Sequence, residues 1–256
     1  MKDLEWDREP ATPPMLRWSG APEGVSVAFT GRAGGVSEGA FASLNLGALT
    51  ADEPPRVAEN RRRAVAAIGA DGATATMAWQ VHGADVREVG EQATSGRFLE
   101  PGAEPFPKSD GLVTSLPALA LTLLTADCLP VAIAAADGSR LALLHAGWRG
   151  LEAGIVERGV EAVGLPAVAA VGPGAGPCCY EVGEDVAAPL ASRFGQDVIR
   201  GGHADLWLCA ERALRSVGVE RVAVAGECTI CNPDRYFSHR RDRGITGRQG
   251  VVGVRA

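Results

Sequence analysis

The chain has 256 residues, of which 46% are hydrophobic and 22% charged, a balance that is ordinary for a soluble globular protein. Its formal net charge of −6 argues against a nucleic-acid surface, which needs a basic balance or a clustered basic stripe. We find no N-terminal apolar segment with a cleavage site, and the longest apolar run, from Leu116, falls short of the roughly 20 residues of a membrane span. We therefore expect a cytoplasmic protein with neither a nucleic-acid nor a membrane partner.

The first third of the chain contains a strand and a helix. Residues 1–20 hold several prolines and are expected to form a loosely held N-terminal arm, ahead of one domain over residues 21–256. Residues 25–39 are typical of a strand that leads into a glycine-rich loop. A helix is expected over residues 53–70, because its prolines suit a helix start and Gly69 suits a helix stop.

The next segment has a strand pattern followed by a polar stretch. The alternation in residues 76–89 predicts a strand that carries His82 in it or beside it. Residues 91–110 combine polar side chains with glycine and proline, which favours a mobile loop or a lid.

The middle of the chain is more apolar. Residues 119–137 form a nearly continuous apolar run that is broken at residues 125–128, and residues 141–147 form a second run. Both are typical of strands that are covered on both faces. The remaining pattern predicts a helix over 150–164, a strand, glycine-rich loop and helix over 168–194, a helix over 204–218 and closing strands over 222–256.

The order of these elements predicts the fold class. Strands and helices mix along the chain without an internal repeat or a clear linker. This favours a single-domain α/β or α+β layered sandwich with mixed β-sheets over a clean doubly wound sheet.

Three residues of metal-ligand type lie at strands or strand ends. They are His82, Cys128 and His145, separated by 46 and 17 residues. These separations are too long for a zinc finger and suit a site where strands converge. Two imidazoles and one thiolate can bind Zn²⁺ and leave the fourth tetrahedral position open, which is the pattern of catalytic zinc sites.

We take these three residues and the neighbouring Asp127, which can orient a ligand from behind, as the candidate catalytic group. A plainer interpretation stays open. A cysteine after an apolar strand is often a small buried hydrophobe, and a histidine at a strand end is often a half-buried residue with satisfied hydrogen bonds.

The six cysteines are expected to be reduced in the cytoplasm, which favours thiol or metal chemistry over disulfides. Cys228 and Cys231 form a Cys-x-x-Cys motif, and Cys178 and Cys179 are adjacent. Two Cys-x-x-Cys arms would predict a zinc ribbon, but one arm here lacks the spacing. A lone Cys-x-x-Cys can be redox active, and we favour buried, reduced thiols.

Three arginines, Arg32, Arg149 and Arg248, each adjoin a glycine. A glycine lets a ligand approach the backbone closely, and arginine can grip an anion with two parallel hydrogen bonds. The glycine-rich residues 172–185 fit neither the P-loop nor the dinucleotide-binding fingerprint.

Several motifs together resemble one known family. In chain order they are GGVSEGAFASLNLG, QVHG, TADCLPV, HAGWRG, GPCCYEVG and FSHRRDRGITGRQ. They are similar to the multicopper polyphenol oxidase or laccase-domain family, whose members are also described as purine nucleoside phosphorylases. The resemblance runs from about Arg32 to Gln249, nearly the whole chain.

The resemblance implies a single-domain α/β sandwich of unusual, laccase-domain topology, with zinc ligands that fall on His82, Cys128 and His145. It implies phosphorolysis of adenosine, inosine, guanosine and methylthioadenosine, with hydrolytic deamination of adenosine as a second activity. The expected partners are thus purine nucleosides and phosphate. One departure is Glu211, which stands before Arg212 where many members have asparagine.

Copper chemistry is less well supported. A multicopper oxidase needs a three-copper cluster carried by repeated His-x-His motifs, and this chain has four histidines and no such motif. We expect Zn²⁺ as the cofactor and Cu²⁺ only as an adventitious metal.

For phosphorolysis, Arg32, Arg149 and Arg248 are the candidates that hold phosphate. Asn45 and Gln80 are candidates for hydrogen bonds to the base or ribose. Three other functions stay open: a cysteine hydrolase with Cys128 as nucleophile, a copper-binding redox protein similar to a polyphenol oxidase, and a structural zinc domain in which a further cysteine closes the site.

Overall fold

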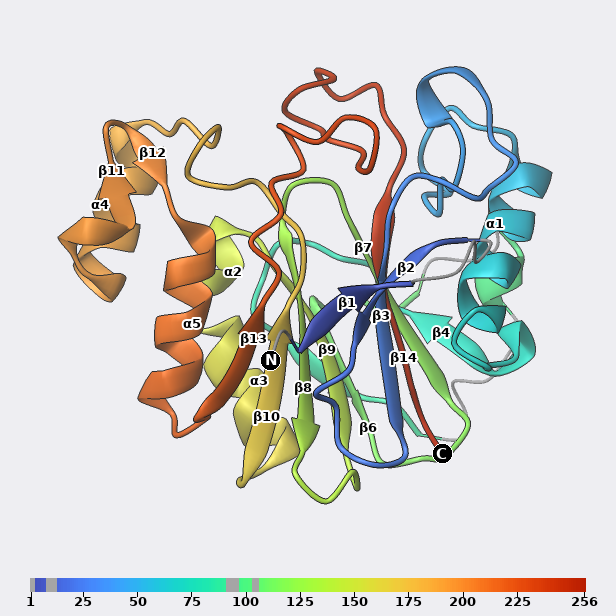
Figure 1. Cartoon of the computed structure of the whole chain (residues 1–256), viewed down its shortest axis with the longest axis horizontal. Helices are drawn as coiled ribbons and strands as arrows, with labels where there is room; N and C mark the ends of the chain where they lie inside the picture. The colour runs from blue at the N-terminus through green and yellow to red at the C-terminus, as the bar shows by residue number, and fades with distance from the viewer. Residues whose placement is uncertain (1–2, 8–12, 91–96, 103–105) are drawn as a thin grey trace.

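The computed structural model describes residues 3–7, 13–90, 97–102 and 106–256. Two six-stranded sheets form its centre (Figure 1). The first sheet has the order β1 (Leu4–Trp6), β2 (Met15–Trp18), β3 (Val25–Thr30), β14 (Gln249–Arg255), β7 (Ala120–Thr125) and β4 (Ala75–Met77). The second has the order β13 (Arg221–Val224), β10 (Ala167–Val171), β8 (Leu129–Ala135), β9 (Leu141–Ala146), β6 (Gly111–Thr114) and β5 (Val86–Glu88).

Both sheets are mixed. The pairs β4–β7, β10–β13 and β5–β6 are parallel, and the other pairs are antiparallel. A separate two-stranded ribbon joins β11 (Ile199–Arg200) to β12 (His203–Ala204). The predicted α/β sandwich with mixed sheets is confirmed.

Helices cover the outer faces of the two sheets (Figure 1). The second sheet is covered by α2 (Trp148–Glu152), α3 (Ile155–Val163), α4 (Glu184–Phe194) and α5 (Leu206–Ser216), and the first sheet by α1 (Pro54–Ala66). Three apolar cores fill the spaces: one under the four helices, one between the sheets, and one under α1. The molecule therefore has four layers.

The central strands are apolar throughout because each of their faces meets a core. In β8, Val131 and Ile133 pack in the core under the helices, whereas Ala132 and Ala134 pack between the sheets. Successive side chains of a strand point to opposite faces. A strand buried on both faces thus needs an unbroken apolar run, as the sequence predicted for β7, β8 and β9.

Two sequence-based boundaries were wrong. The strand predicted over residues 76–89 is two short strands, β4 in one sheet and β5 in the other, with His82 in the loop between them. The helix predicted over residues 150–164 is divided into α2 and α3 at Gly154, whose φ of 88° is incompatible with a helix interior.

Parts of the expected N-terminal arm (residues 1–20) and of the expected lid (residues 91–110) lie outside the described residues. Within the first segment, β1 and β2 pair with each other and β2 pairs with β3. Within the second, residues 91–96 and 103–105 are not described, and a short 3-10 helix spans Arg97–Leu99. Over the described residues, no helix has the length and hydropathy to cross a bilayer.

Candidate metal centre and cavity

The three predicted metal ligands lie together. The ligand atoms of His82, Cys128 and His145 are all within 4.8 Å of one another. The two imidazole rings meet edge to face, with centroids 4.8 Å apart and planes at 79°. Two nitrogens and one sulfur therefore converge on one point, as the spacing in the sequence led us to expect.

The strand register brings Cys128 to His145. The chain leaves β7 in the first sheet and enters β8 in the second, so residues 126–128 cross between the sheets. In the antiparallel pair β8–β9, Pro130 lies opposite His145 and Leu129 opposite Ala146. Continued by one residue, this register places Cys128 beside Gly147, at the end of β9.

Gly147 is required by the space around the thiol. A Cβ atom at this position would lie 2.9 Å from the Cys128 Sγ and 3.5 Å from a ring carbon of His82. Gly150 has a related role, because a Cβ there would lie 2.9 Å from the carbonyl oxygen of Gly83. The glycines of the HAGWRG motif therefore allow the His82 loop to approach the end of β9.

Asp110, which is not among the residues predicted from the sequence, organises the centre. Its fully buried carboxylate accepts hydrogen bonds from the backbone N–H groups of Val81 (3.1 Å), His82 (2.9 Å) and Gly83 (2.7 Å). The same carboxylate lies 2.9 Å from His145 Nδ1, and the His145 N–H donates to the Asp110 carbonyl oxygen at 2.7 Å. His82 has a left-handed φ of 61°, which these bonds stabilise.

The electrostatic environment prepares the thiol for a cation. Burial opposes ionisation of Cys128, but the positive charge of His145 and hydrogen bonds from both histidines outweigh it and lower the pKa of the thiol to about 6. Burial also opposes protonation of His145, yet the charge of Cys128 and the hydrogen bond to Asp110 raise its pKa to about 9. A metal ion that binds here must displace the histidine proton, because the ligand is the neutral imidazole.

Asp127 lines the cavity, but among the described residues its hydrogen bonds are not to His82 or His145. Its carboxylate accepts hydrogen bonds from the Thr229 hydroxyl (2.6 Å) and the Arg240 N–H (2.7 Å). Its carbonyl oxygen accepts from the Ala175 N–H at 2.7 Å. The acid that holds a ligand in place is Asp110, and Asp127 joins the crossing segment to two distant loops.

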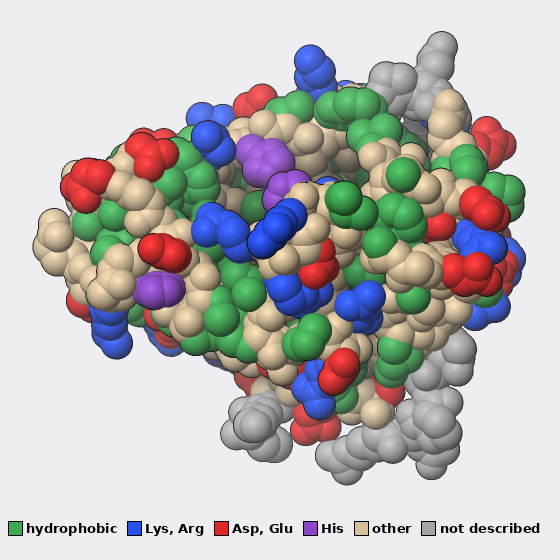
Figure 2. Space-filling model, turned by 90° about the horizontal axis from the view of Figure 1, so that it is seen from above, with side chains coloured by type: hydrophobic (Ala, Val, Ile, Leu, Met, Phe, Trp, Pro, Cys, Tyr) green, Lys and Arg blue, Asp and Glu red, His purple; other side chains and the backbone are tan. Residues whose placement is uncertain are grey.

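The metal centre opens into a cavity of about 660 Å³. This volume lies within the range of small-molecule sites. On the face that is seen from above in Figure 2, histidine side chains (purple) and Lys or Arg side chains (blue) gather near the middle. Besides the three ligands, the cavity is lined by Met77, Trp79, Gln80, Phe106, Leu124, Asp127, Trp148, Arg149, Tyr180, His239, Arg240 and Arg248, among others.

Of the three predicted phosphate-binding arginines, Arg149 and Arg248 line the cavity and Arg32 does not. Arg149 lines the cavity with an exposed side chain, and its guanidinium carbon lies 4.4 Å from the centre of the Trp148 ring. Arg248 also lines the cavity, where it donates to the carbonyl oxygens of Thr246 and Gly247. Arg32 is not among the lining residues and donates instead to the carbonyl oxygens of Ala42 and Pro233.

The two predicted amides also differ. Gln80 lines the cavity, but both ends of its amide are paired with the backbone of Leu124. Asn45 is fully buried and is not among the lining residues. It donates to Thr50 and Asp52 and accepts from the N–H groups of Gly47 and Arg248, so its contacts are those of a loop organiser.

Several residues that line the cavity were not predicted from the sequence. Arg240 and His239 lie in the FSHRRDRGITGRQ motif, of which only Arg248 was chosen as a candidate site residue. Tyr180 follows the cysteine pair, and the Arg240 guanidinium carbon lies 5.1 Å from the centre of its ring. The motifs that contain these residues can be recognised in the sequence, but no rule on the separation of residues along the chain connects them with His82 or Cys128.

The remaining cysteines form a second group. The Sγ atoms of Cys178, Cys179, Cys228 and Cys231 all lie within 4.8 Å of one another. The expectation of buried thiols holds for Cys228 and is wrong for Cys178 and Cys231, which are exposed. Sequence spacing could not reveal this group because its two halves lie in the loops that follow two different strands of the second sheet, β10 and β13.

Glu211, the departure noted above, lies on α5 outside the cavity lining. It forms an ion pair with Arg215 one turn away, and its neighbour Arg212 pairs with Asp197. The contacts of both residues are structural.

We expect Gly147→Ala to weaken metal binding by about tenfold or more, because the added methyl group would overlap the ligand thiol. Zinc affinity measured by competition with a chromogenic chelator checks this. The matched control is Gly90→Ala, since a Cβ there meets no atom of the described residues within 4 Å. Equal affinities of the two variants would contradict the steric role of Gly147.

We expect Asp110→Asn to lower zinc affinity by about 10- to 100-fold, because an amide cannot accept all of the hydrogen bonds that fix His145 and the His82 loop. The same competition assay measures the change. Asp85→Asn is the control, because Asp85 is exposed and paired with Arg158 at the surface. An unchanged affinity in the Asp110 variant would show that these bonds do not position the ligands.

Comparison with known proteins places this centre in context. The family model described as "Multi-copper polyphenol oxidoreductase laccase" matches residues 26–255. A purine nucleoside phosphorylase of Xylella fastidiosa (strain 9a5c) is 42% identical over 240 residues, covering 87% of this chain and 90% of that protein. The purine nucleoside phosphorylase YfiH of Escherichia coli (strain K12) is 36% identical over 237 residues, covering 89% and 92%.

Solved structures agree with this relationship. The crystal structure of YlmD from Geobacillus stearothermophilus superposes with a TM-score of 0.89 at 31% sequence identity, covering 100% of this chain and 99% of that one. That of Bacillus licheniformis YfiH gives 0.88 at 28% identity, covering 98% and 99%. The match along nearly the whole chain shows that this protein belongs to the multi-copper polyphenol oxidoreductase laccase family.

Proposed function

We propose that the protein is a zinc-dependent purine nucleoside phosphorylase. The observation that carries the proposal is the metal centre of His82, Cys128 and His145 on the wall of a cavity that also presents the exposed guanidinium of Arg149. Relatives that share more than a third of their residues with this chain are named purine nucleoside phosphorylases. The cavity volume of about 660 Å³ accommodates a ligand of nucleoside size.

The donor set of the centre fits zinc. Two imidazole nitrogens and one thiolate are the ligand types that Zn²⁺ takes, and three protein ligands leave a position for substrate or water. Asp110 satisfies the other nitrogen of His145, as in other zinc sites where a carboxylate orients the histidine. Bound there, Zn²⁺ would supply Lewis acidity, the chemistry on which hydrolytic deamination of adenosine depends.

Phosphorolysis requires phosphate to attack the ribose C1′ while the purine leaves. We assign Arg149 to phosphate, because its side chain is exposed in the cavity and its guanidinium stacks on the face of Trp148. Arg248 adds positive charge from the same wall. Two or more charge-assisted hydrogen bonds would hold the nucleophile and offset its negative charge.

The purine needs an apolar wall and a proton donor. Met77, Phe106 and Leu124 supply apolar lining. His239 and Tyr180 border the same cavity and carry ring N–H and hydroxyl groups, so they are the groups available to hydrogen-bond the leaving base. Adenosine, inosine, guanosine and methylthioadenosine are the proposed substrates, with adenosine deamination as a second activity.

Copper chemistry in the manner of a laccase has less support. The two metal-capable groups of the described residues contain two histidines in total, both in the triad. His239 lines the cavity apart from them, and His203 Nδ1 lies 3.0 Å from the carbonyl oxygen of Gly201. A three-copper cluster needs more imidazoles than this.

A cysteine hydrolase is the second candidate, because one observation favours it. Without a metal, the thiol of Cys128 has a lowered pKa and lies with His145, which is in turn held by Asp110. Nucleophile, base and orienting acid in that order are the arrangement of cysteine hydrolases.

We expect purified, zinc-loaded protein to release adenine or hypoxanthine from nucleosides only when phosphate is present. Chromatography of the products with and without phosphate measures this, and ribose 1-phosphate should appear in equal amount. Release of the base without phosphate, together with alkylation of Cys128 that zinc does not block, would favour the hydrolase.

We expect Arg149→Met to raise the KM for phosphate by about 10- to 100-fold, since a charge-assisted hydrogen bond contributes about 1.5–3 kcal/mol. Steady-state kinetics with phosphate varied at fixed nucleoside measures the change. Arg193→Met is the control, because Arg193 lies on α4 and pairs with Glu157 outside the cavity lining. A larger effect on the KM for nucleoside than on that for phosphate would contradict this assignment.

A further inference from the structure

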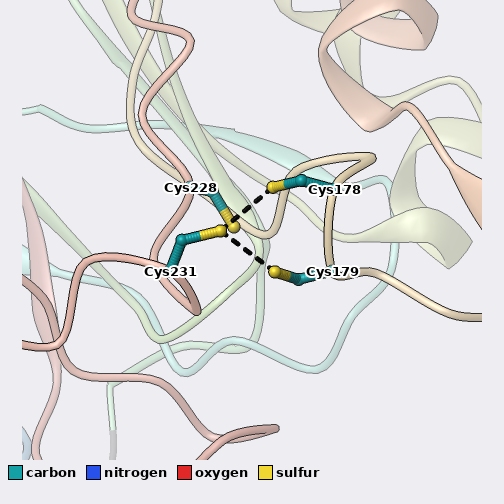
Figure 3. A group of neighbouring side chains, drawn as sticks. All are labelled: Cys178, Cys179, Cys228 and Cys231. Carbon is teal, nitrogen blue, oxygen red and sulfur yellow. Dashed lines mark hydrogen bonds between the residues drawn. The ribbon is translucent and has the colours of Figure 1, made fainter.

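The four-cysteine group lies apart from the proposed catalytic centre and comes from two loops. Cys178 and Cys179 follow β10, whereas Cys228 and Cys231 follow β13 (Figure 3). Because β10 and β13 are parallel neighbours, both loops leave the same edge of the second sheet. A bridge between Gly174 and Cys228 continues the pairing beyond the strands and brings the loops together.

The spacing of the sulfurs suits a tetrahedral metal ion. All four lie within 4.8 Å of one another, and the Cys231 Sγ lies 3.1 Å from that of Cys178 and 3.0 Å from that of Cys179. Four thiolates at the usual Zn–S distance of about 2.3 Å stand about 3.8 Å apart, so shifts of an ångström or less complete the site. All four cysteines are free.

The innermost sulfur, that of Cys228, already has a backbone donor. The Gly176 N–H donates to the Cys228 Sγ at 3.3 Å, and Cys228 is the buried member of the group. Donors directed at a ligand sulfur favour the thiolate, which is the form that binds metal.

The Cys-x-x-Cys turn is braced from outside. Arg241 donates to the carbonyl oxygen of Thr229 at 2.8 Å, inside the turn, and Asn232 donates to that of Cys228 at 2.8 Å. A Cβ on Gly176 would lie 2.6 Å from the Trp207 ring, so this loop packs closely on α5. The two turns that carry the cysteines are therefore braced by contacts of the protein itself.

The arrangement favours an ion over a disulfide. Cys231 is equally close to Cys178 and Cys179, so the geometry selects neither as a single partner. A disulfide would also leave two thiols without a role, whereas a tetrahedral ion uses all four. Four thiolates and no open position are the pattern of structural zinc sites.

We propose that Cys178, Cys179, Cys228 and Cys231 bind a second Zn²⁺ ion, which fastens the two loops that support the wall of the cavity. Tyr180, next to Cys179, lines the cavity. The same loops hold Asp127: Thr229 donates to its carboxylate at 2.6 Å, and the Ala175 N–H donates to its carbonyl oxygen at 2.7 Å. The second ion thus stabilises the segment that carries Cys128, without taking part in the reaction.

The test counts metal ions in protein purified under reducing conditions without added copper and then equilibrated with Zn²⁺. We expect about two Zn²⁺ per chain in the unaltered protein, and about one each in Cys128→Ala and Cys231→Ser, because each variant removes a ligand from one site. The double variant should hold none. Cys209→Ala is the matched control and should keep both ions, since Cys209 is buried in the core under the helices and belongs to neither group.

Two further measurements use the Cys128→Ala protein, in which only the four-cysteine site remains. Cobalt substitution should give the charge-transfer and ligand-field bands of four-thiolate coordination, and Cys178→Ser should diminish them. Chelation should lower the Tm of Cys128→Ala but not that of the double variant, since a ligand of the native state alone stabilises it. These readouts do not depend on nucleoside turnover, so they stand or fall separately from the proposed activity.

Cys128→Ala protein that stays metal-free after reduction would overturn the proposal. So would a native disulfide from Cys231 to Cys178 or Cys179, seen by mass spectrometry of unreduced protein, together with failure of the reduced protein to bind zinc. Iron as the one metal retained by the four thiolates would overturn the assignment to zinc.

Discussion

The candidate metal centre depends on the buried carboxylate of Asp110. This one group accepts hydrogen bonds from three successive N–H groups of the His82 loop and also holds His145 through its ring nitrogen. The loop comes from the connection between the two sheets, and His145 comes from the end of β9. A single anion therefore fixes two ligands that local sequence cannot bring together, and its burial makes each of these hydrogen bonds stronger than it would be in water.

The crossing between the sheets supplies the third candidate ligand, Cys128, and connects the candidate metal centre with the loops of the four-cysteine group. Residues 126–128 pass from β7 to β8, which places Cys128 where the layers meet. Asp127, in the middle of this segment, is held by Thr229 and Ala175 from the loops that carry the four-cysteine group. Because β10 and β13 are parallel neighbours, the loops that follow them start at the same end of the second sheet, where they support the cavity wall.

Much of the fold followed from hydrophobic periodicity. The nearly continuous apolar runs of β7, β8 and β9 predicted strands covered on both faces. The cores on either side of each sheet explain them, because β7 lies between the second and third cores and β8 and β9 lie between the first and second. The short strands β4 and β5 were merged in the prediction because each has three residues, too few for a period to stand out. Gly154 divides a helix that periodicity alone continued, because a positive φ leaves no trace in the hydrophobic pattern.

The sequence by itself determined the candidate ligands His82, Cys128 and His145 and the apolar strands in or beside which Cys128 and His145 lie, because ligand chemistry and apolar runs are local properties of the chain. The tertiary structure decided which acid supports the centre, which arginines reach the cavity and that four cysteines meet. Asp110, Arg240 and Cys178 lie far along the chain from their partners, and only the pairing of strands across two sheets sets those distances. Arg32 and Asn45 had suitable chemistry, but the loops that they stabilise hold them outside the cavity lining.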